Sequence, residues 1–271
     1  PDWAGLDAQG ILAAVREGRI KALYLMGADP VRDFPDPEAV RAALDGLEFL
    51  VVQDSLPNLS AAYADVVLPA GAPTEIGGTV TGVGRHVQAL AVAVRPSAGV
   101  RPDWEIIEEI MSRFGAPTRM DSLGAVQEEI EKVIPAYAGI GNGGPEKGGF
   151  RWAPEALPSE RAKPGSSGGG AADAAGASRA GGLRLLTSPM LFSTGAMAAE
   201  SKAIQAAGPQ AYAEIHPDAA AALGVSEGEA VNLSSPRGKI SVTVRVDRKT
   251  PPGAVYVPSG AGDSPSNVLL S

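Results

Sequence analysis

LEFLVVQDSLPNLSAAYADVVLPAGAPTEIGGTVTGVGRHVQ, residues 47–88, is the stretch that decides the fold. It holds two short apolar runs, 47–52 and 65–69, separated by a polar and alanine-rich segment. Short β-branched runs joined by about one helical turn are typical of neighbouring parallel strands that are buried on both faces. Because loops at the carboxyl ends of such strands line the ligand crevice of an open sheet, we expect Asp54 and the glycine-rich loop after residue 69 to lie on that rim.

The wider pattern over residues 20–69 is strand, helix, strand, short helix, strand. This order predicts one half of a doubly wound α/β sheet. Helix boundaries follow from capping carboxylates, prolines at the first helical position and glycines that end the apolar stripe. The predicted helices are 8–17 with Asp7 as N-cap, a second that opens at Asp36-Pro37 and stops at Gly46, 104–114 with Asp103 as N-cap, and 122–134.

Composition limits the classes of function. A net charge of −8 argues against a nucleic-acid surface, because neutralising phosphates requires clustered Lys and Arg. The chain has no Cys and only two His, so thiolate-bound iron–sulfur clusters are excluded and a zinc site is not expected. No apolar run approaches the ~20 residues needed to cross a bilayer, so we expect no direct membrane insertion. Because the sequence begins at Pro1 without Met, we also expect a piece of a longer protein.

A change of composition marks the predicted domain boundary. Residues 158–182 contain no Leu, Ile, Val, Met or aromatic residue and are rich in Gly, Ala and Ser, which predicts a flexible linker. Short strands and tight turns follow, and in residues 239–246 Ile and Val alternate with polar residues. Closely spaced short strands predict a small barrel. We therefore predict an α/β domain with trailing helices over 1–157, a linker over 158–182 and a β-barrel over 183–271.

Several ordered motifs resemble the molybdopterin oxidoreductase superfamily. Residues 27–30, Gly-Ala-Asp-Pro, are similar to a motif at the end of the first strand in that family, and residues 212–246 resemble its double-psi β-barrel domain. Within the superfamily the sequence is most similar to the large iron–sulfur subunit of NADH–quinone oxidoreductase, respiratory complex I. The resemblance implies a partial doubly wound parallel sheet, like the third domain of the family, plus a small double-psi β-barrel. The further motifs are Gln53-Asp54, Ala64 to Pro69, Glu75, Gly78-Thr79, Gly84-Arg85 and Val87-Gln88.

Asp54, with Ser60 and Asp65, is the first candidate constellation. The resemblance implies that the Asp54 carboxylate accepts from the guanine edge of a bound pterin dinucleotide. The alternative is that Asp54 and Asp65 cap short helices or brace turns. Active family members carry Thr-Glu-Thr-Ala where this chain has residues 58–61, Asn-Leu-Ser-Ala, and often Asn where it has Gly82. Because both differences fall on loops that would contact the nucleotide, we favour the structural role.

Other candidates carry weaker signals. Glycines 77, 78, 82 and 84 would admit a phosphate closely, although turns demand glycine equally. Glu75 and Arg85 are expected to form a structural ion pair. Ser193, Gly195 and Asn267 match regions that approach the pterin nucleotide in active members. The candidate cofactor-binding residues, vestigial on this interpretation, are Gly27, Asp29, Asp54, Ser60, Asp65, Gly78, Thr79, Arg85, Ser193, Gly195 and Asn267.

Two functions follow from the resemblance. The first is a structural C-terminal region of the large iron–sulfur subunit, which does no chemistry and binds no cofactor itself. The resemblance then implies NADH–quinone electron transfer for the whole complex, iron–sulfur clusters elsewhere, and partner subunits of a respiratory complex at the cytoplasmic, inner face of the cell membrane. The second is the cofactor-binding half of an active enzyme such as a formate dehydrogenase, which would use molybdopterin guanine dinucleotide. The differences at residues 58–61 and Gly82 favour the first.

Overall fold

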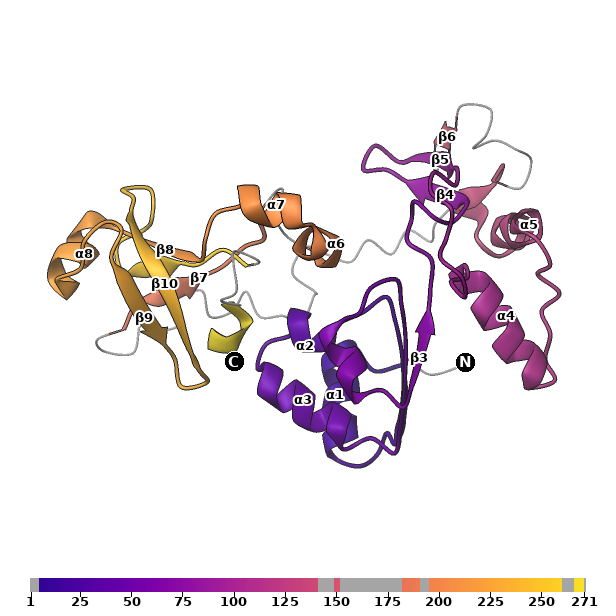
Figure 1. Cartoon of the computed structure of the whole chain (residues 1–271), viewed down its shortest axis with the longest axis horizontal. Helices are drawn as coiled ribbons and strands as arrows, with labels where there is room; N and C mark the ends of the chain where they lie inside the picture. The colour runs from indigo at the N-terminus through magenta and orange to yellow at the C-terminus, as the bar shows by residue number, and fades with distance from the viewer. Residues whose placement is uncertain (1–4, 141–148, 152–181, 191–194, 260–265, 271) are drawn as a thin grey trace. The chain divides into compact units, whose positions relative to one another are not determined.

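The computed structural model describes residues 5–140, 149–151, 182–190, 195–259 and 266–270 (Figure 1). The chain forms two compact units. The second unit is inserted into the first along the sequence. The first unit comprises Pro1–Val52, Leu56–Val66 and Ala174–Ser271, and the second comprises Gln53–Ser55 and Val67–Asp173.

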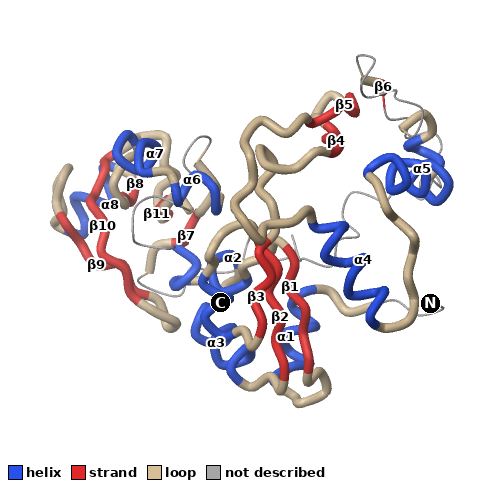
Figure 2. Tube along the Cα trace, turned by 45° about the vertical axis from the view of Figure 1, so that its right-hand side comes forward, coloured by secondary structure: helices blue, strands red, loops and turns tan. Residues whose placement is uncertain are grey.

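A three-stranded sheet of order β1-β2-β3 is built from β1 (Ala22–Met26), β2 (Phe49–Asp54) and β3 (Val66–Pro69) (Figure 2). Two backbone hydrogen bonds show that β2 and β3 run in the same direction. The Asp65 amide donates to the Leu50 carbonyl at 2.9 Å, and five residues further on the Ala70 amide donates to the Asp54 carbonyl at 3.0 Å. The predicted parallel sheet is confirmed.

Two predicted helices pack on this sheet, α1 (Ala8–Arg16) and α3 (Pro37–Asp45). Both caps are as predicted: the Asp7 carboxylate accepts an amide hydrogen bond of 2.7 Å at the start of α1, and Asp36 accepts one of 3.1 Å at the start of α3. These bonds satisfy amides that the first helical turn leaves without a partner. The shared core consists of Val31, Val40, Leu44, Leu50 and Val52.

One face of the sheet differs from the prediction of burial on both sides. Leu50 and Val52 are buried, whereas Tyr24, Met26 and Phe49 are exposed. Side chains alternate between the two faces of a strand, so the exposed set lies on the face opposite the core. Between the strands lie two short elements, α2 (Pro30–Asp33), which the sequence analysis does not predict, and the 3-10 helix η1 (Leu59–Tyr63).

The second unit contains an antiparallel sheet of order β4-β5-β6. Its strands are β4 (Gly78–Thr81), β5 (His86–Leu90) and β6 (Phe150–Arg151). Part of the predicted glycine-rich loop is therefore a strand, because the β-branched residues 79–81 pair with β5.

Two helices follow in the second unit, α4 (Asp103–Arg113) and α5 (Leu123–Val133), and then the 3-10 helix η2 (Pro135–Tyr137). The prediction that Asp103 is the N-cap of α4 is wrong, because Pro102 occupies that position. Asp103 lies in the first turn instead, and its Oδ1 accepts a hydrogen bond of 2.6 Å from Gln53 Nε2.

The C-terminal part of the first unit is a curled half-barrel sheet of five strands in the order β7-β11-β8-β10-β9. β10 pairs in parallel with β8 and antiparallel with β9, while β11 pairs in parallel with β7 and antiparallel with β8. Ile240, Val242 and Val244 point into its core. The strands are β7 (Arg184–Leu186), β8 (Tyr212–Ile215), β9 (Ala230–Ser234), β10 (Lys239–Val246) and β11 (Ala254–Tyr256).

The sheet is accompanied by α6 (Ala196–Glu200), α7 (Lys202–Ala207), α8 (Pro217–Leu223) and the 3-10 helix η5 (Ser266–Leu269). The predicted fold class, a partial doubly wound parallel sheet plus a small β-barrel domain, is confirmed. The division into 1–157, 158–182 and 183–271 stays a prediction, because residues 152–181 lie outside the described residues. No helix in the described ranges has the length and apolar character that crossing a membrane requires.

Candidate functional site

Asp29 follows the first strand and is the residue before α2. Its carboxylate is only 5% exposed. Oδ2 accepts from the Leu59 amide at 3.0 Å, and Oδ1 accepts from both the amide and the hydroxyl of Ser60, at 3.1 and 2.6 Å. Arg32 Nε lies 3.5 Å from Oδ2. A buried carboxylate is tolerated only when it is paired and hydrogen-bonded, and Asp29 meets both conditions.

Ser60 completes this arrangement. Its side chain is fully buried, and its hydroxyl oxygen also accepts a 3.3 Å hydrogen bond from the Val31 amide. The Asp29–Ser60 pair therefore joins the end of β1 and the start of α2 to η1. Of the predicted site residues, the structure brings these two into direct contact.

Asn267, on η5, lies at the other end of α2. Its amide nitrogen donates to the carbonyl oxygens of Arg32 and Phe34, at 2.9 and 3.0 Å, and more weakly to that of Val31, at 3.4 Å. The last carbonyls of a helix lack partners within it, so Asn267 serves as a C-terminal cap for α2. Asp29 and Asn267, both predicted from the resemblance, thus meet through α2.

Two buried polar atoms next to α2 have no hydrogen-bond partner in the described part of the chain, Arg32 Nη1 and Asn267 Oδ1. Nearby, the pKa of the Asp33 carboxyl is raised, first by partial burial and then by the Asp29 carboxylate, while Arg32 opposes the shift. Native structures leave few buried polar atoms without partners, so this pair marks a place where a further polar group would be favourable.

Four other predicted residues belong to the second unit. Asp54 ends β2 and is half-buried, Gly78 and Thr79 lie in β4, and Arg85 lies in the turn after β4 with a φ of 64°. The predicted ion pair between Glu75 and Arg85 does not form. Glu75 instead accepts from the Ala72 amide at 3.0 Å, which braces its own turn.

The remaining predicted residues are Asp65, Gly27, Gly195 and Ser193. The Asp65 carboxylate accepts from the Leu50 amide at 2.7 Å and so links the start of β3 to β2. Gly27 and Gly195 both have positive φ, 58° and 101°, a conformation that favours glycine. Ser193 lies outside the described residues.

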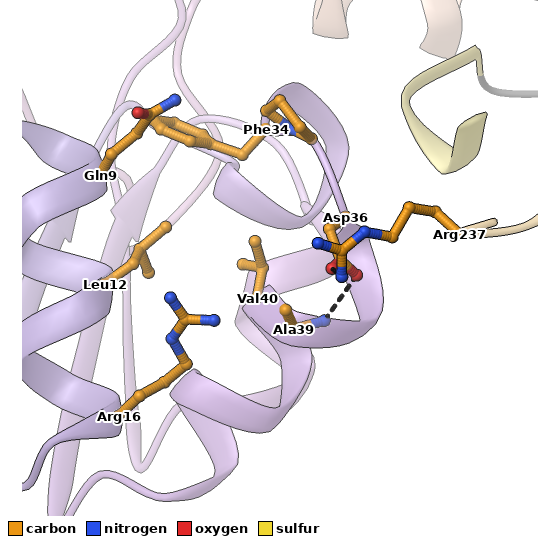
Figure 3. A pocket seen from close by; sticks show the side chains of 9 residues that line it. Gln9, Leu12, Arg16, Phe34, Asp36, Ala39, Val40 and Arg237 are labelled. Atoms are coloured by element: carbon orange, nitrogen blue, oxygen red, sulfur yellow. Dashed lines mark hydrogen bonds and ion pairs between the residues drawn. The ribbon is translucent and has the colours of Figure 1, made fainter. Parts of the chain in front are cut away.

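A cleft that the sequence analysis does not predict lies between α1 and α3. It has a volume of about 270 Å³, and Figure 3 shows Leu12 and Arg16 of α1 facing Val40 of α3 across it. At its edge Arg237 Nη1 lies 2.7 Å from Asp36 Oδ2, which is also the capping residue of α3. The sequence marks Asp36 as a cap and Arg237 as a turn residue, but it gives no signal that they meet.

Comparison with protein-family models identifies both ends of the chain. Residues 5–113 match the model "Molybdopterin oxidoreductase", and residues 183–271 match "Molydopterin dinucleotide binding domain". The chain carries domains of the molybdopterin oxidoreductase family. Acetylene hydratase from Pelobacter acetylenicus has a similar structure, with a TM-score of 0.63 over 93% of this chain and 39% of that protein. At 18% sequence identity this similarity concerns the fold alone.

Curated relatives match the chain along most of its length. The NADPH-Fe(3+) oxidoreductase subunit alpha of Geobacter sulfurreducens is 37% identical over 100% of this chain and 31% of its own length. The G 2 subunit of the NADH-quinone oxidoreductase of Rhizobium meliloti is 31% identical over 95% of this chain and 29% of its own. YrhE of Bacillus subtilis, provisionally named a formate dehydrogenase, is 31% identical over 97% of this chain and 28% of its own. The chain thus spans less than a third of these relatives.

Among the described residues, no group of three or more His, Cys, Asp or Glu side chains is placed to hold a metal ion. The family models support a molybdopterin cofactor in the family as a whole.

Proposed function

We propose that this chain is a structural region of the large iron–sulfur subunit of an NADH–quinone oxidoreductase, and that it supports electron transfer from NADH to quinone in a larger assembly without a redox centre of its own. The proposal rests on the hydrogen bonds that the polar side chains around α2 make within the chain. The Asp29 carboxylate, the Ser60 hydroxyl and the Asn267 amide hydrogens are all engaged by the chain itself. These side chains therefore fit a structural role better than that of ligands to a pterin nucleotide.

Relatives that are named as subunits support the assembly part of this proposal. Subunit alpha of an NADPH-Fe(3+) oxidoreductase and the G 2 subunit of an NADH-quinone oxidoreductase each match nearly the whole chain. We propose other subunits of a respiratory complex as the partners, with the assembly at the cytoplasmic face of the cell membrane. NADPH is an alternative electron donor on the strength of the first of these relatives.

A second candidate function is the cofactor-binding half of an active molybdopterin oxidoreductase, such as a formate dehydrogenase. Arg32 Nη1 and Asn267 Oδ1 favour it, because these buried atoms offer a donor and an acceptor that no described residue uses. A pterin nucleotide has complementary phosphate and base edges. On this alternative Arg32 and Asn267 would contact the nucleotide and Asp54 would accept from the guanine, while the bound group would supply the redox-active metal.

The test is cofactor analysis of the full chain, produced in a host that makes molybdopterin guanine dinucleotide. Molybdenum and tungsten are measured by mass spectrometry, and GMP is measured after acid hydrolysis. We expect substoichiometric amounts of all three. One equivalent of GMP with molybdenum or tungsten would overturn the structural proposal and support the second function.

Two substitutions then test whether binding, if it is found, depends on the proposed site. If the chain retains the dinucleotide, Asp54→Ala should lower the amount of GMP recovered. Asp45→Asn, which changes an exposed acid in α3, should leave that amount unchanged. If GMP is absent, titration with GDP as the probe should show no heat of binding for the wild-type chain or for either variant.

A further inference from the structure

An apolar groove of about 330 Å³ runs between α4 and α5 in the second unit. We call it the α4–α5 groove. Ile107 of α4 is 40% exposed and Val133 of α5 is 66% exposed, and no residue of α5 is buried. The apolar stripe of α5 is therefore only partly covered by the described part of the chain, because Val126 and Ile130 are half-buried while Val133 is exposed. The side chains that form the groove include Trp104, Ile107, Met120, Val126, Ile130 and Val133.

Negative charge borders the groove on one side. Trp104, Glu108 and Met120 line both the groove and an adjoining acidic pocket, which also contains Glu105 and Asp121. Counting Asp and Glu against Lys and Arg, α4 carries 4 acids and 1 base and α5 carries 3 acids and 1 base, so the two helices contribute −5.

Part of that charge is compensated within the chain and part is not. Glu109 pairs with Arg101 and Arg113. Glu108, in contrast, accepts hydrogen bonds from the hydroxyl and amide of Thr118 and from the Arg119 amide, none of which brings a cation. Asp121 makes no ion pair with a described residue. Two uncompensated carboxylates thus stand beside the apolar surface of the groove.

We propose that the α4–α5 groove binds an amphipathic helix of a partner protein, with its apolar side chains in the groove and its Lys or Arg side chains beside Glu108 and Asp121. Each wall is an 11-residue helix, about 16 Å long at 1.5 Å per residue, which matches a partner helix of about three turns. Helix-in-groove recognition uses this combination of apolar anchors and flanking charge. The proposal is independent of whether a pterin nucleotide binds.

Segments of the chain itself fit the groove poorly. Every described helix carries at most one basic side chain, so the described part of a second copy offers no basic amphipathic helix. Residues 158–182 contain three basic residues but no large apolar side chain, so that segment has no anchor for the groove. A partner of different sequence is the occupant that the chemistry favours.

Peptide binding to the full chain tests the proposal. The probes are two fluorescein-labelled helical peptides of the same amphipathic pattern, one made of Leu and Lys and the other of Leu and Glu. We expect the Leu/Lys peptide to bind more tightly by at least about tenfold, as measured by fluorescence anisotropy. Ile107→Ser with Val133→Ser should weaken its binding by at least about tenfold, because truncated apolar anchors dominate such interfaces.

Matched variants keep the test specific. Phe114 is 83% exposed and lies outside the groove, so Phe114→Ser should leave the affinity unchanged. Glu108→Gln with Asp121→Asn should weaken binding of the Leu/Lys peptide and reduce its dependence on salt. All variants replace exposed or half-exposed side chains, and circular dichroism verifies that each remains folded.

Three outcomes would overturn the proposal. One is an affinity for the Leu/Lys peptide that the Ile107 and Val133 changes leave unaltered in folded protein. Another is equal binding of the Leu/Glu peptide. The third is a wild-type dimer that Val133→Ser converts to a monomer, which would assign the groove to a second copy of the chain.

Discussion

The Ser60 hydroxyl donates a hydrogen bond of 2.6 Å to Asp29 Oδ1, across 31 positions of sequence and with both side chains buried. The same carboxylate holds the amides of Leu59 and Ser60. One buried charge therefore organises the backbone of two loops that follow neighbouring strands. In a molybdopterin oxidoreductase fold these loops lie at the carboxyl ends of the strands, where a ligand crevice is expected.

Asp29→Asn should destabilise the first unit by about 2 to 4 kcal/mol. The change removes a charged acceptor from buried donors, and each buried donor left without a partner costs about 1–3 kcal/mol. Urea unfolding followed by circular dichroism measures the loss. Asp45→Asn, at an exposed position in α3, is the control and should change the free energy of unfolding by less than about 0.5 kcal/mol.

Asn267→Asp should be more destabilising than Asn267→Ala at neutral pH. Alanine only removes the donor to α2, at a cost of about 1–3 kcal/mol. An ionised aspartate also places a negative charge against the carbonyl oxygens of Arg32 and Phe34, which cannot donate to it. Thermal unfolding of both variants gives the order. A more stable Asp variant would show that the amide nitrogen is not the group that faces α2.

Val244→Ala should lower the free energy of unfolding by about 2–3 kcal/mol, from lost burial and the cavity left behind. Val244 is 1% exposed in the core of the half-barrel. Lys239→Gln, on the same strand but exposed, should be nearly neutral. The comparison by urea denaturation tests the register of β10, because a shift by one residue would exchange the buried and exposed sets.

The Glu109 carboxyl should titrate with a pKa of about 2, because hydrogen bonds and charge from Arg101 and then Arg113 favour its ionised form. The folded-state pKa lies below the ordinary value, so the linked stability is present above the unfolded-state pKa and declines as the pH falls toward 2. Carbon-detected NMR of the side chain measures the titration directly. Arg101→Gln should move the pKa up toward 4.5, its ordinary value.

Local rules predict much of this fold. Asp7 and Asp36 cap α1 and α3 as expected, and the alternation in β10 buries Ile240, Val242 and Val244. The helical segment 196–207 is not predicted, although its alanine content and the Ser201 cap of α7 are helix signals. The short strands and tight turns on either side favour a β prediction for the whole region, so these helix signals are missed.

Tertiary contacts in the candidate site are harder to predict from the sequence than helix caps or strand alternation. The motif at residues 27–30 and Asn267 both point to the same family site, but their spacing does not reveal that α2 lies between them. Nor does it reveal that the oxygens of Asp29 accept from η1, because hydrogen-bond partners depend on how loops from separate strands meet. The Glu75–Arg85 prediction is wrong for the same reason, since a nearer backbone amide takes the carboxylate.

The contact between Asn267 and α2 has a consequence for synthesis on the ribosome. Residues 32 and 267 are 235 positions apart, so the cap of α2 can form only when translation of this stretch is almost finished. The inserted second unit, whose residues end before the half-barrel begins, emerges earlier and is able to fold while the flanking unit still lacks its last strands. Closing so long a loop is entropically costly and slow, so α2 remains uncapped until then. During that interval the nascent polypeptide exposes apolar surface of the kind that chaperones bind.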